Sequence, residues 1–167
     1  MKMELIQPFI NAADAVLAET LQSPTKIGDL SMDEEIYRRK GLAALVVIKG
    51  EIEGRVILDL EPAVAVKLAG YLAGAEVQQS EQIVSETVCE VANMIIGNSV
   101  TLLNDQGFRF KVFPPEIHAS EEGLTGSHDT EAMVLCFETP AGNVYMNIAM
   151  HYQRRRRRER TAVPSLY

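Results

Sequence analysis

The sequence predicts an α+β fold in which an antiparallel sheet, built from hairpins, carries helices packed on it. Two pairs of segments rich in β-forming residues are each joined by a short glycine-bearing turn, as in hairpins. The segments with helical periodicity do not alternate with strands as repeated β–α–β units, which disfavours a parallel sheet. The 167 residues, 47% of them apolar, suffice for one domain with a single core.

The first half of the chain is expected to hold a helix and then a hairpin. A helix over residues 4–22 tolerates Pro8, because a missing N–H costs little near the first turn. Residues 23–40 are polar and poorly patterned, so no regular element is expected there. Residues 43–49 and 53–60 are rich in β-formers and flank a short glycine-bearing turn, which predicts a hairpin.

The second half begins with two predicted helices. A proline opens a short helix over 62–73, and a long helix follows over 81–104. Residues 108–113 alternate as a strand does, until Pro114–Pro115 forces an edge or a break.

A second hairpin is expected near the end of the chain. Residues 132–138 and 144–151 are strand-like and are joined by a good turn sequence at 140–143. Residues 122–126 are glycine-bearing and predict a mobile loop. No internal repeat is visible in the sequence.

Several classes of protein are disfavoured by composition. The apolar segments are interrupted by charges, so we expect no membrane span. The first residues lack the apolar h-region of a signal peptide, so we expect no export signal and a cytoplasmic protein. Cys89 and Cys136 lack metal-ligand spacing and the three histidines (His118, His128, His151) are scattered, so no metal site is expected. Phosphate-binding, dinucleotide-binding and serine-hydrolase motifs are absent.

Charge is distributed unevenly along the chain, whose net charge is −7. Residues 154–160 hold six of the 16 basic residues and a single acid, which leaves −12 on the remainder. We therefore expect one domain over residues 1–152 and a basic, disordered tail over 153–167. Nucleic acid, anionic lipid or the acidic domain itself could bind this tail. No nucleic-acid partner is expected, because neither interleaved aromatic residues nor a nucleic-acid-binding fold accompanies the tail.

The long predicted helix carries a polar stripe along one face. Glu86, Glu90, Asn93 and Gly97 lie at i, i+4, i+7 and i+11, which places them on one side of a helix. The apolar residues expected to face the core are Val84, Val88, Val91, Ile95 and Leu102. For an arbitrary Glu and Asn, a solvated helix face is the favoured explanation of such a stripe. With 17 Glu and 6 Asn residues, about 0.6 Glu-x-x-Asn matches arise by chance. Only the surrounding sequence can make the motif informative.

That surrounding sequence resembles the CheC/CheX/FliY family of bacterial chemotaxis phosphatases, and the CheX branch most closely. The family's helix carries Glu-x-x-Asn followed by Gly, as in residues 90–97 here, and a proline pair follows about twenty residues later, matched by Pro114–Pro115. The stretch Gly50–Gly54 is similar to the family's Gly-x-Ile-Glu-Gly hairpin and leads into a predicted helix ending at Gly74. The resemblance spans roughly residues 41–118 and implies a CheC/CheX-like fold.

The resemblance implies hydrolysis of the aspartyl-phosphate on a CheY-type response regulator. The regulator would supply Mg²⁺ and cationic contacts, so this chain would need no bound cofactor and would mainly position a water. The Asn93 amide can accept a hydrogen bond from that water and donate another without repelling the phosphoryl anion. By the same resemblance Glu90 pairs with a regulator lysine and fixes the approach.

The remaining residues of the stripe are assigned to the partner surface. Gly97 permits the partner's backbone to approach closely, and Glu86 is expected to lie at the border of the contact surface. Asn98 and Thr101 are candidates for peripheral contacts with the partner. The family usually has Ser or Asp where this chain has Glu86. This departure leaves a second interpretation open, a non-catalytic adaptor or flagellar-switch module that docks through the same face.

The number of motifs and the assembly are also implied by the resemblance. The first predicted helix, over 4–22, carries no Glu/Asn pair, which favours the one-site CheX type over CheC or FliY. A homodimer formed by joining sheet edges is a further expectation.

Overall fold

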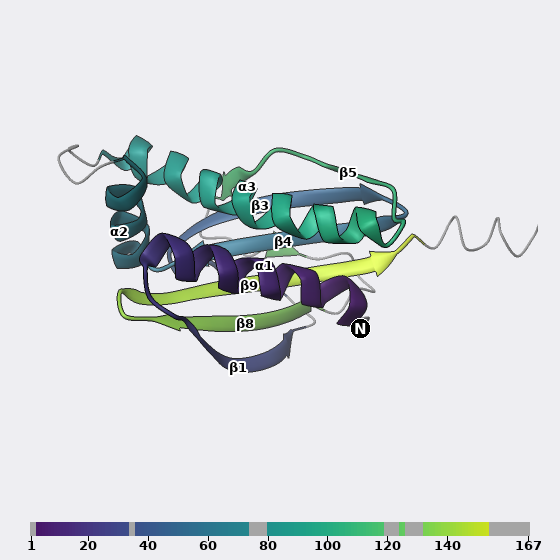
Figure 1. Cartoon of the computed structure of the whole chain (residues 1–167), viewed down its shortest axis with the longest axis horizontal. Helices are drawn as coiled ribbons and strands as arrows, with labels where there is room; N and C mark the ends of the chain where they lie inside the picture. Colours follow the sequence, from purple (N-terminus) through teal and green to yellow (C-terminus); the bar gives the residue numbers. More distant parts are fainter. Residues whose placement is uncertain (1–2, 34–35, 74–79, 119–123, 126–131, 154–167) are drawn as a thin grey trace, which may run out of the picture.

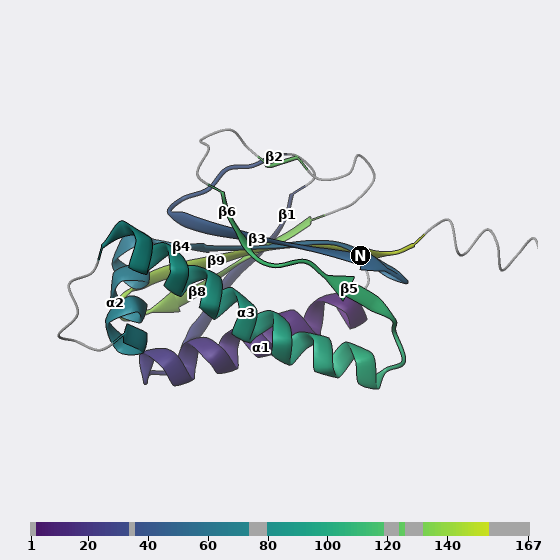
Figure 2. The same ribbon diagram turned by 90° about the horizontal axis from the view of Figure 1, so that it is seen from above.

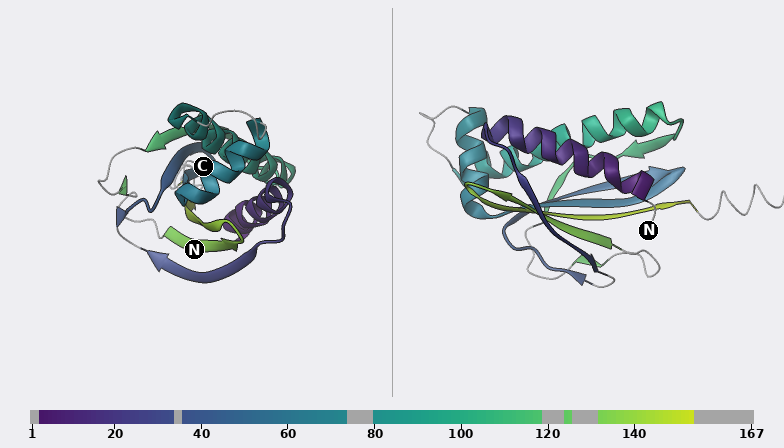
Figure 3. Two further views of the ribbon diagram at one scale, coloured as in Figure 1. Left: turned by 90° about the vertical axis from the view of Figure 1, so that its left-hand side faces the viewer. Right: turned by 60° about the horizontal axis from the view of Figure 1, so that its bottom comes forward.

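The computed structural model describes residues 3–33, 36–73, 80–118, 124–125 and 132–153. Three helices cover one face of an antiparallel sheet (Figures 1 and 3). They are α1 (Met3–Leu21), α2 (Pro62–Ala73) and α3 (Glu81–Asp105). Helices α1 and α3 pack on each other above the sheet, and α2 closes one end of the layer (Figure 1).

The sheet has seven strands in the order β1-β8-β9-β4-β3-β5, and β6 pairs with β3 beside β5. The strands are β1 (Lys26–Asp33), β3 (Leu42–Gly50), β4 (Ile52–Leu60), β5 (Phe110–Val112), β6 (Glu116–His118), β8 (Ala132–Thr139) and β9 (Gly142–Tyr152). All of their pairings are antiparallel. Strands β2 (Ile36–Tyr37) and β7 (Leu124–Thr125) form a separate pair on the sheet face opposite the helices (Figure 2).

The topology contains a repeat that the sequence does not reveal. A helix, an edge strand and a hairpin occur in the order α1, β1, β3, β4 and again in the order α3, β5, β8, β9. The central strands β4 and β9 pair with each other, whereas each edge strand pairs with the hairpin of the other half, β1 with β8 and β5 with β3. The two halves are therefore interlocked in one sheet.

The first hairpin depends on its glycines. Gly54 has a φ of +154°, and a Cβ atom there would lie 1.8 Å from the carbonyl oxygen of Ala149 on the neighbouring strand. Gly50 has a φ of +144°, and a Cβ there would lie 2.6 Å from Cα of Phe110. Side chains are excluded at both positions because neighbouring backbones approach closely. These are two of the residues on which the family resemblance was based.

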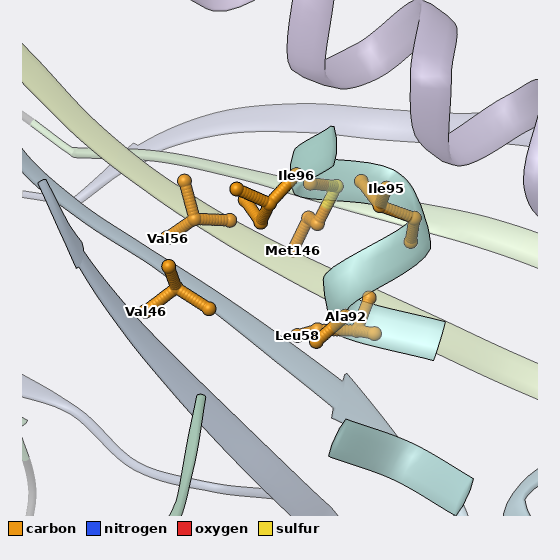
Figure 4. A pocket seen from close by; sticks show the side chains of 7 residues that line it. All are labelled: Val46, Val56, Leu58, Ala92, Ile95, Ile96 and Met146. Atoms are coloured by element: carbon orange, nitrogen blue, oxygen red, sulfur yellow. The ribbon is translucent and has the colours of Figure 1, made fainter. Parts of the chain in front are cut away.

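The core beneath α3 is tightly packed. Ala92, Ile95 and Ile96 meet side chains of β3, β4 and β9 around a small gap (Figure 4). The cavity volume open to a water-sized sphere is about 10 Å³, and its lining is almost wholly apolar. A water needs about 10–15 Å³ and polar partners, so this gap stays dry. The helix is thus held on a rigid base.

Most predicted elements are present. The three helices and both hairpins lie where the sequence placed them, which confirms the α+β fold with an antiparallel sheet. The predicted strand over 108–113 is shorter, at 110–112, and ends before the proline pair.

The segment over 23–40 was wrongly expected to hold no regular element. Strand β1 forms there because it pairs with β8 at the sheet edge, although its side chains are polar or exposed and a bulge between Ile27 and Leu30 interrupts its alternation. Within the predicted loop at 122–126, residues 124–125 pair as β7, and the others lie outside the described residues.

Candidate functional site

The exposed side of α3 carries the predicted site residues. The helix begins after Ser80, whose Oγ accepts a hydrogen bond of 3.2 Å from the amide of Ile83 and so caps the first turn. The buried residues of α3 face α1 and the sheet. The opposite, solvent-exposed stripe consists of Glu86, Glu90, Asn93 and Gly97, and we call these four residues the ridge. The shared exposed face predicted from their spacing is present.

One member of the predicted apolar stripe does not face the core. Leu102 is 45% exposed, whereas Leu103 is fully buried. The buried side of α3 shifts around the helix near its C-terminal end, where Ser99 and Leu103 point inward. Adjacent residues are about 100° apart on a helix, so Leu102 turns outward when Leu103 turns in.

Asn93 and Glu90 present unoccupied functional groups to solvent. Among the described residues, neither side chain has a hydrogen-bonding or ion-pairing partner within the chain. A spacing of i to i+3 brings their Cβ atoms to within about 5–6 Å, one turn apart on the same face. An amide that can orient a water and a carboxylate that can pair with a cation are thus held side by side on a rigid helix.

Glu86 differs from Glu90 because it has a partner. Gln82 Nε2 donates a hydrogen bond of 3.0 Å to Glu86 Oε1, from one turn earlier on the exposed surface. This contact draws the Glu86 carboxylate towards the start of the helix and away from Glu90. Sequence reasoning missed Gln82, although its i, i+4 spacing from Glu86 was a usable signal.

Gly97 is not required by the fold. A Cβ atom built at this position meets no atom within 4 Å. Glycine in the middle of a helix costs roughly 0.5–1 kcal/mol relative to alanine, and no contact within the described chain offsets that cost. The gap is free for an approaching molecule. Nearby, Thr101 Oγ1 donates a 3.1 Å hydrogen bond to the Gly97 carbonyl, and Asn98 is exposed.

The ridge is the exposed face of a helix, and its residues line neither the cavity beneath α3 nor a groove at the sheet edge. The cavity beneath α3 contains no ridge residue, and a larger groove of about 240 Å³ lies elsewhere, at the sheet edge between Val47 and Pro114. Small-molecule sites are concave and bury most of their ligand. The ridge therefore suits contact with a macromolecule.

Other chemically active residues do not gather at the ridge. Cys89 is partly buried, and burial raises the pKa of its thiol, which disfavours the reactive thiolate. Across the described ranges, no group of three or more His, Cys, Asp or Glu residues is arranged to hold a metal ion. His118 lies in β6 and His151 lies 3.8 Å from Glu53 on the sheet, while His128 falls outside the described residues. None of the described helices is long and apolar enough to cross a membrane.

Comparison with known structures identifies the fold. A CheC-like superfamily protein from Shewanella sp. PV-4 matches with a TM-score of 0.79 and 20% identity, over 90% of this chain and 99% of that chain. The chemotaxis protein CheX from Desulfovibrio desulfuricans matches with a TM-score of 0.77 and 20% identity, over 90% of this chain and 99% of that chain. CheX in a CheX–CheY–BeF₃–Mg²⁺ complex from Borrelia burgdorferi matches with a TM-score of 0.68 and 28% identity, again over 90% of this chain and 99% of that chain.

Comparison at the level of sequence identifies the family. A search of curated proteins found no significant match. The sequence model of the family described as "Chemotaxis phosphatase CheX" matches residues 42–138, which is more than half of the chain and includes the whole of α3. The chain therefore belongs to the CheX family of chemotaxis phosphatases.

Proposed function

We propose that this protein is a phosphatase that hydrolyses the aspartyl-phosphate of a CheY-type response regulator in chemotaxis signalling. One observation carries the proposal: the Asn93 amide and the Glu90 carboxylate lie unpartnered and exposed on the ridge of a CheX-family chain. The Borrelia burgdorferi relative was crystallised as a complex with CheY, beryllofluoride and Mg²⁺, which supports a regulator of that kind as the partner.

Asn93 is proposed to position the water that attacks the phosphorus atom. Its amide oxygen accepts a hydrogen bond from the water, and its amide NH₂ remains available for a second contact. The group is neutral, so it approaches the phosphoryl anion without the repulsion that a carboxylate would add. Positioning an in-line nucleophile is the main requirement in phosphoryl transfer, because little covalent chemistry is left to the enzyme.

Glu90 is proposed to dock the regulator. It lies one turn before Asn93, so pairing its carboxylate with a lysine of the regulator would set the depth and angle at which the amide enters the active site. Gly97 leaves room for the regulator backbone one turn beyond. Glu86 would border the contact, with its carboxylate held by Gln82.

The chain is proposed to contribute no metal ion or other cofactor. The Mg²⁺ would be held by the regulator beside its phosphorylated aspartate, where it neutralises charge on the phosphoryl group. The chain's contribution is then the amide, the docking carboxylate and the surface around them. Such a reaction would take place in the cytoplasm, where we place the protein.

The proposal is tested by the decay of a phosphorylated CheY-type regulator in the presence of Mg²⁺, with and without the protein. Asn93→Ala should abolish the stimulated decay, a loss of about 100-fold or more for a misplaced nucleophile. Asn93→Asp keeps the side-chain shape and should fail as well, because it replaces the amide with a like charge. Both variants should keep the wild-type thermal midpoint, since an exposed substitution usually changes stability by roughly 0.5 kcal/mol or less. Wild-type stimulation by Asn93→Ala would refute the mechanism.

The same experiment separates a phosphatase from an adaptor. An adaptor would bind the phosphorylated regulator without changing its lifetime, and its binding would respond to reversal of the Glu90 charge. Accelerated decay of the phosphorylated regulator that depends on Asn93 would exclude the adaptor function.

We also propose that the protein forms a homodimer through the β1 edge. Ile27, Leu30 and Met32 on this strand are 44–54% exposed, and β1 is the outermost strand on its side of the sheet. At the opposite edge the outermost strands are β5 and β6, which are only three residues long each and pair with β3. An apolar, unpaired edge is the one on which a second copy would extend the sheet.

A further inference from the structure

A groove lies at the edge of the sheet, where β3 changes its partner from β5 to β6. Residues 113–115 connect these two short strands, and a groove of about 240 Å³ lies beside the connection. Leu45 and Val47 of β3 are half-buried where they line it, and Phe113 and Pro114 line it from the connection. Small-molecule sites typically measure about 300–1,000 Å³, so this smaller groove suits a single large side chain.

The β3 side chains that line the groove point away from the helices. Leu45, Val47 and Lys49 alternate along the strand with Val46 and Ile48, which belong to the core beneath the helices. Successive side chains of a strand point to opposite faces of the sheet. The sheet therefore separates the groove from the ridge, and a molecule in the groove would not compete with one at the ridge.

Two lysines meet beside the groove without a carboxylate between them. Lys49 of β3 and Lys111 of β5 lie directly opposite each other in the strand register, and both are exposed. Their ammonium groups lie 5.8 Å and 5.1 Å from the centre of the Phe113 ring. Within the described part of the chain, neither lysine forms an ion pair. Like charges placed directly opposite each other destabilise a pair of strands.

Other basic side chains of the sheet show the usual arrangement. Lys26 lies opposite Glu138 with 3.9 Å between Nζ and Oε2, and His151 lies opposite Glu53 at 3.8 Å. At the groove, the Phe113 ring attracts both ammonium groups but supplies no full negative charge. The two lysines therefore leave a place for an anionic group from outside the chain.

We propose that this groove binds an extended, acidic segment of a partner protein. One apolar or aromatic side chain of the segment packs against Leu45 and Val47, and a carboxylate two residues away reaches Lys49 and Lys111. Apolar anchors in such a recess supply most of the affinity of an interface, and complementary charge selects the partner. Alternate side chains of an extended segment share one face, which matches the spacing of Val47 and Lys49.

Glu116 gives the segment a direction. It lies opposite Leu45 in the register of β3 with β6, at the other end of the groove from Lys49, and it is exposed. An acid of the partner is repelled at this end and attracted at the lysine end. The anchor side chain therefore lies on the Glu116 side of the acid.

The proposal is tested by NMR titration of the whole chain with short capped peptides. The probe is the peptide Gly-Phe-Gly-Glu-Gly, and two control peptides replace its Phe by Ala or its Glu by Lys. The probe should shift the backbone amide signals of Val47, Lys49 and Phe113. Its affinity should exceed that of the Ala peptide about ten-fold and that of the Lys peptide about five-fold or more.

Lys111→Glu and Lys67→Glu form a matched pair of variants. Both lysines are exposed and both changes alter the net charge equally, but Lys67 lies on α2, away from the groove. Lys111→Glu should weaken binding of the probe about ten-fold, and Lys67→Glu should leave it unchanged. Lys111→Glu should keep or raise the thermal midpoint, because it turns a like-charge pair into an opposite-charge pair. Lys111→Gln, which only removes the charge, should weaken binding about three-fold at an unchanged midpoint.

Several outcomes would overturn the proposal. Equal affinity for the acidic and basic peptides, or equal weakening by both Lys→Glu variants, would show that the lysine pair does not select an acid. Inorganic phosphate that shifts the same signals as strongly as the probe would leave an anion site without an apolar anchor. Signals that move with protein concentration alone would assign the groove to a second copy of the chain. Absence of any shift at millimolar probe would leave the groove without this ligand, while Asn93-dependent decay would stand.

Discussion

The Tyr37 hydroxyl donates a hydrogen bond of 2.7 Å to Asp59 Oδ2, a carboxylate that is fully buried on the sheet face opposite the helices. The same carboxylate accepts hydrogen bonds from the backbone amides of Lys40 and Gly41, at 2.6 Å and 2.9 Å. One charged side chain thus ties β2 and the turn before β3 to the central sheet. A buried carboxylate is tolerated because several donors satisfy it.

Replacing Asp59 with alanine should destabilise the fold. The change leaves two backbone amides and a tyrosine hydroxyl without their acceptor, at about 1–3 kcal/mol for each buried unsatisfied group. We expect a loss of roughly 3 kcal/mol, which lowers the thermal midpoint by roughly 6–12 °C in a chain of this size. Glu138→Ala, at an exposed site, should change the midpoint little. A loss below about 1 kcal/mol for Asp59→Ala would show that the turn is held by other contacts.

Stability should decline at alkaline pH because two tyrosines hold their protons more tightly in the folded state. Burial, and then the hydrogen bond to Asp59, raise the pKa of Tyr37 above its ordinary value of 10.0. Burial and the hydrogen bond to Glu4 raise the pKa of Tyr152 to about 12. The unfolded chain loses these protons first, so the stabilisation is complete below pH 10 and decreases as the pH rises towards 12. Urea unfolding between pH 8 and pH 11 should show a falling midpoint, with a shallower fall for Tyr37→Phe.

Gly97→Ala should separate stability from activity. The position is exposed in mid-helix and has open space around it, so alanine should stabilise the fold by roughly 0.5–1 kcal/mol. The added methyl group would occupy the gap proposed for the regulator, so stimulated dephosphorylation should fall. Denaturant unfolding and the decay assay on one preparation measure both effects.

Gly54→Ala provides the matched control for that experiment. Its Cβ would meet a backbone oxygen and its φ is positive, so the same substitution should destabilise the fold by about 2 kcal/mol or more. If Gly97→Ala were also destabilising, the gap at the ridge would be a requirement of the fold after all.

Glu90→Gln should weaken docking more than chemistry. The change removes the charge but keeps the shape, and loss of a partly exposed ion pair costs about 1 kcal/mol, or about five-fold in affinity. The regulator concentration giving half-maximal stimulation should therefore rise about five-fold, while the rate at saturation changes little. An unchanged concentration dependence with a collapsed maximal rate would assign Glu90 to the chemical step.

The proposed dimer can be broken by charging the β1 edge. Leu30→Lys together with Met32→Lys places two cations on the exposed side of the strand, where pairing with a second copy would bury them. Light scattering at micromolar concentration should give a dimer mass for the wild-type chain and a monomer mass for the double variant. A monomeric wild-type chain would refute the dimer.

The sequence predicted the elements that are determined by their own residues. Pro62 begins α2, as expected of a proline at the first helical position, and the spacing of Glu90 and Asn93 placed both on the exposed side of α3. The parts that were missed depend on distant partners. Strand β1 takes its conformation from β8 and not from its own pattern, and the acceptor role of Asp59 exists only once residues 40–41 fold over the sheet.

The exchange of edge strands between the two halves has a consequence for the order of folding. Lys26 of β1 pairs with Glu138 of β8, so the two partners are separated by most of the sequence. Strand β4 likewise pairs with β9, near the end of the described residues. During synthesis, the sheet strands β1 and β4 of the first half therefore lack their pairing partners until the last hairpin, β8 and β9, has been made. Contacts of such long range close slowly, because loop entropy is lost before the pairing is gained. The supporting surface beneath the ridge is finished late, so a nascent chain lacking β8 and β9 should display α3 without a rigid base and have no phosphatase activity.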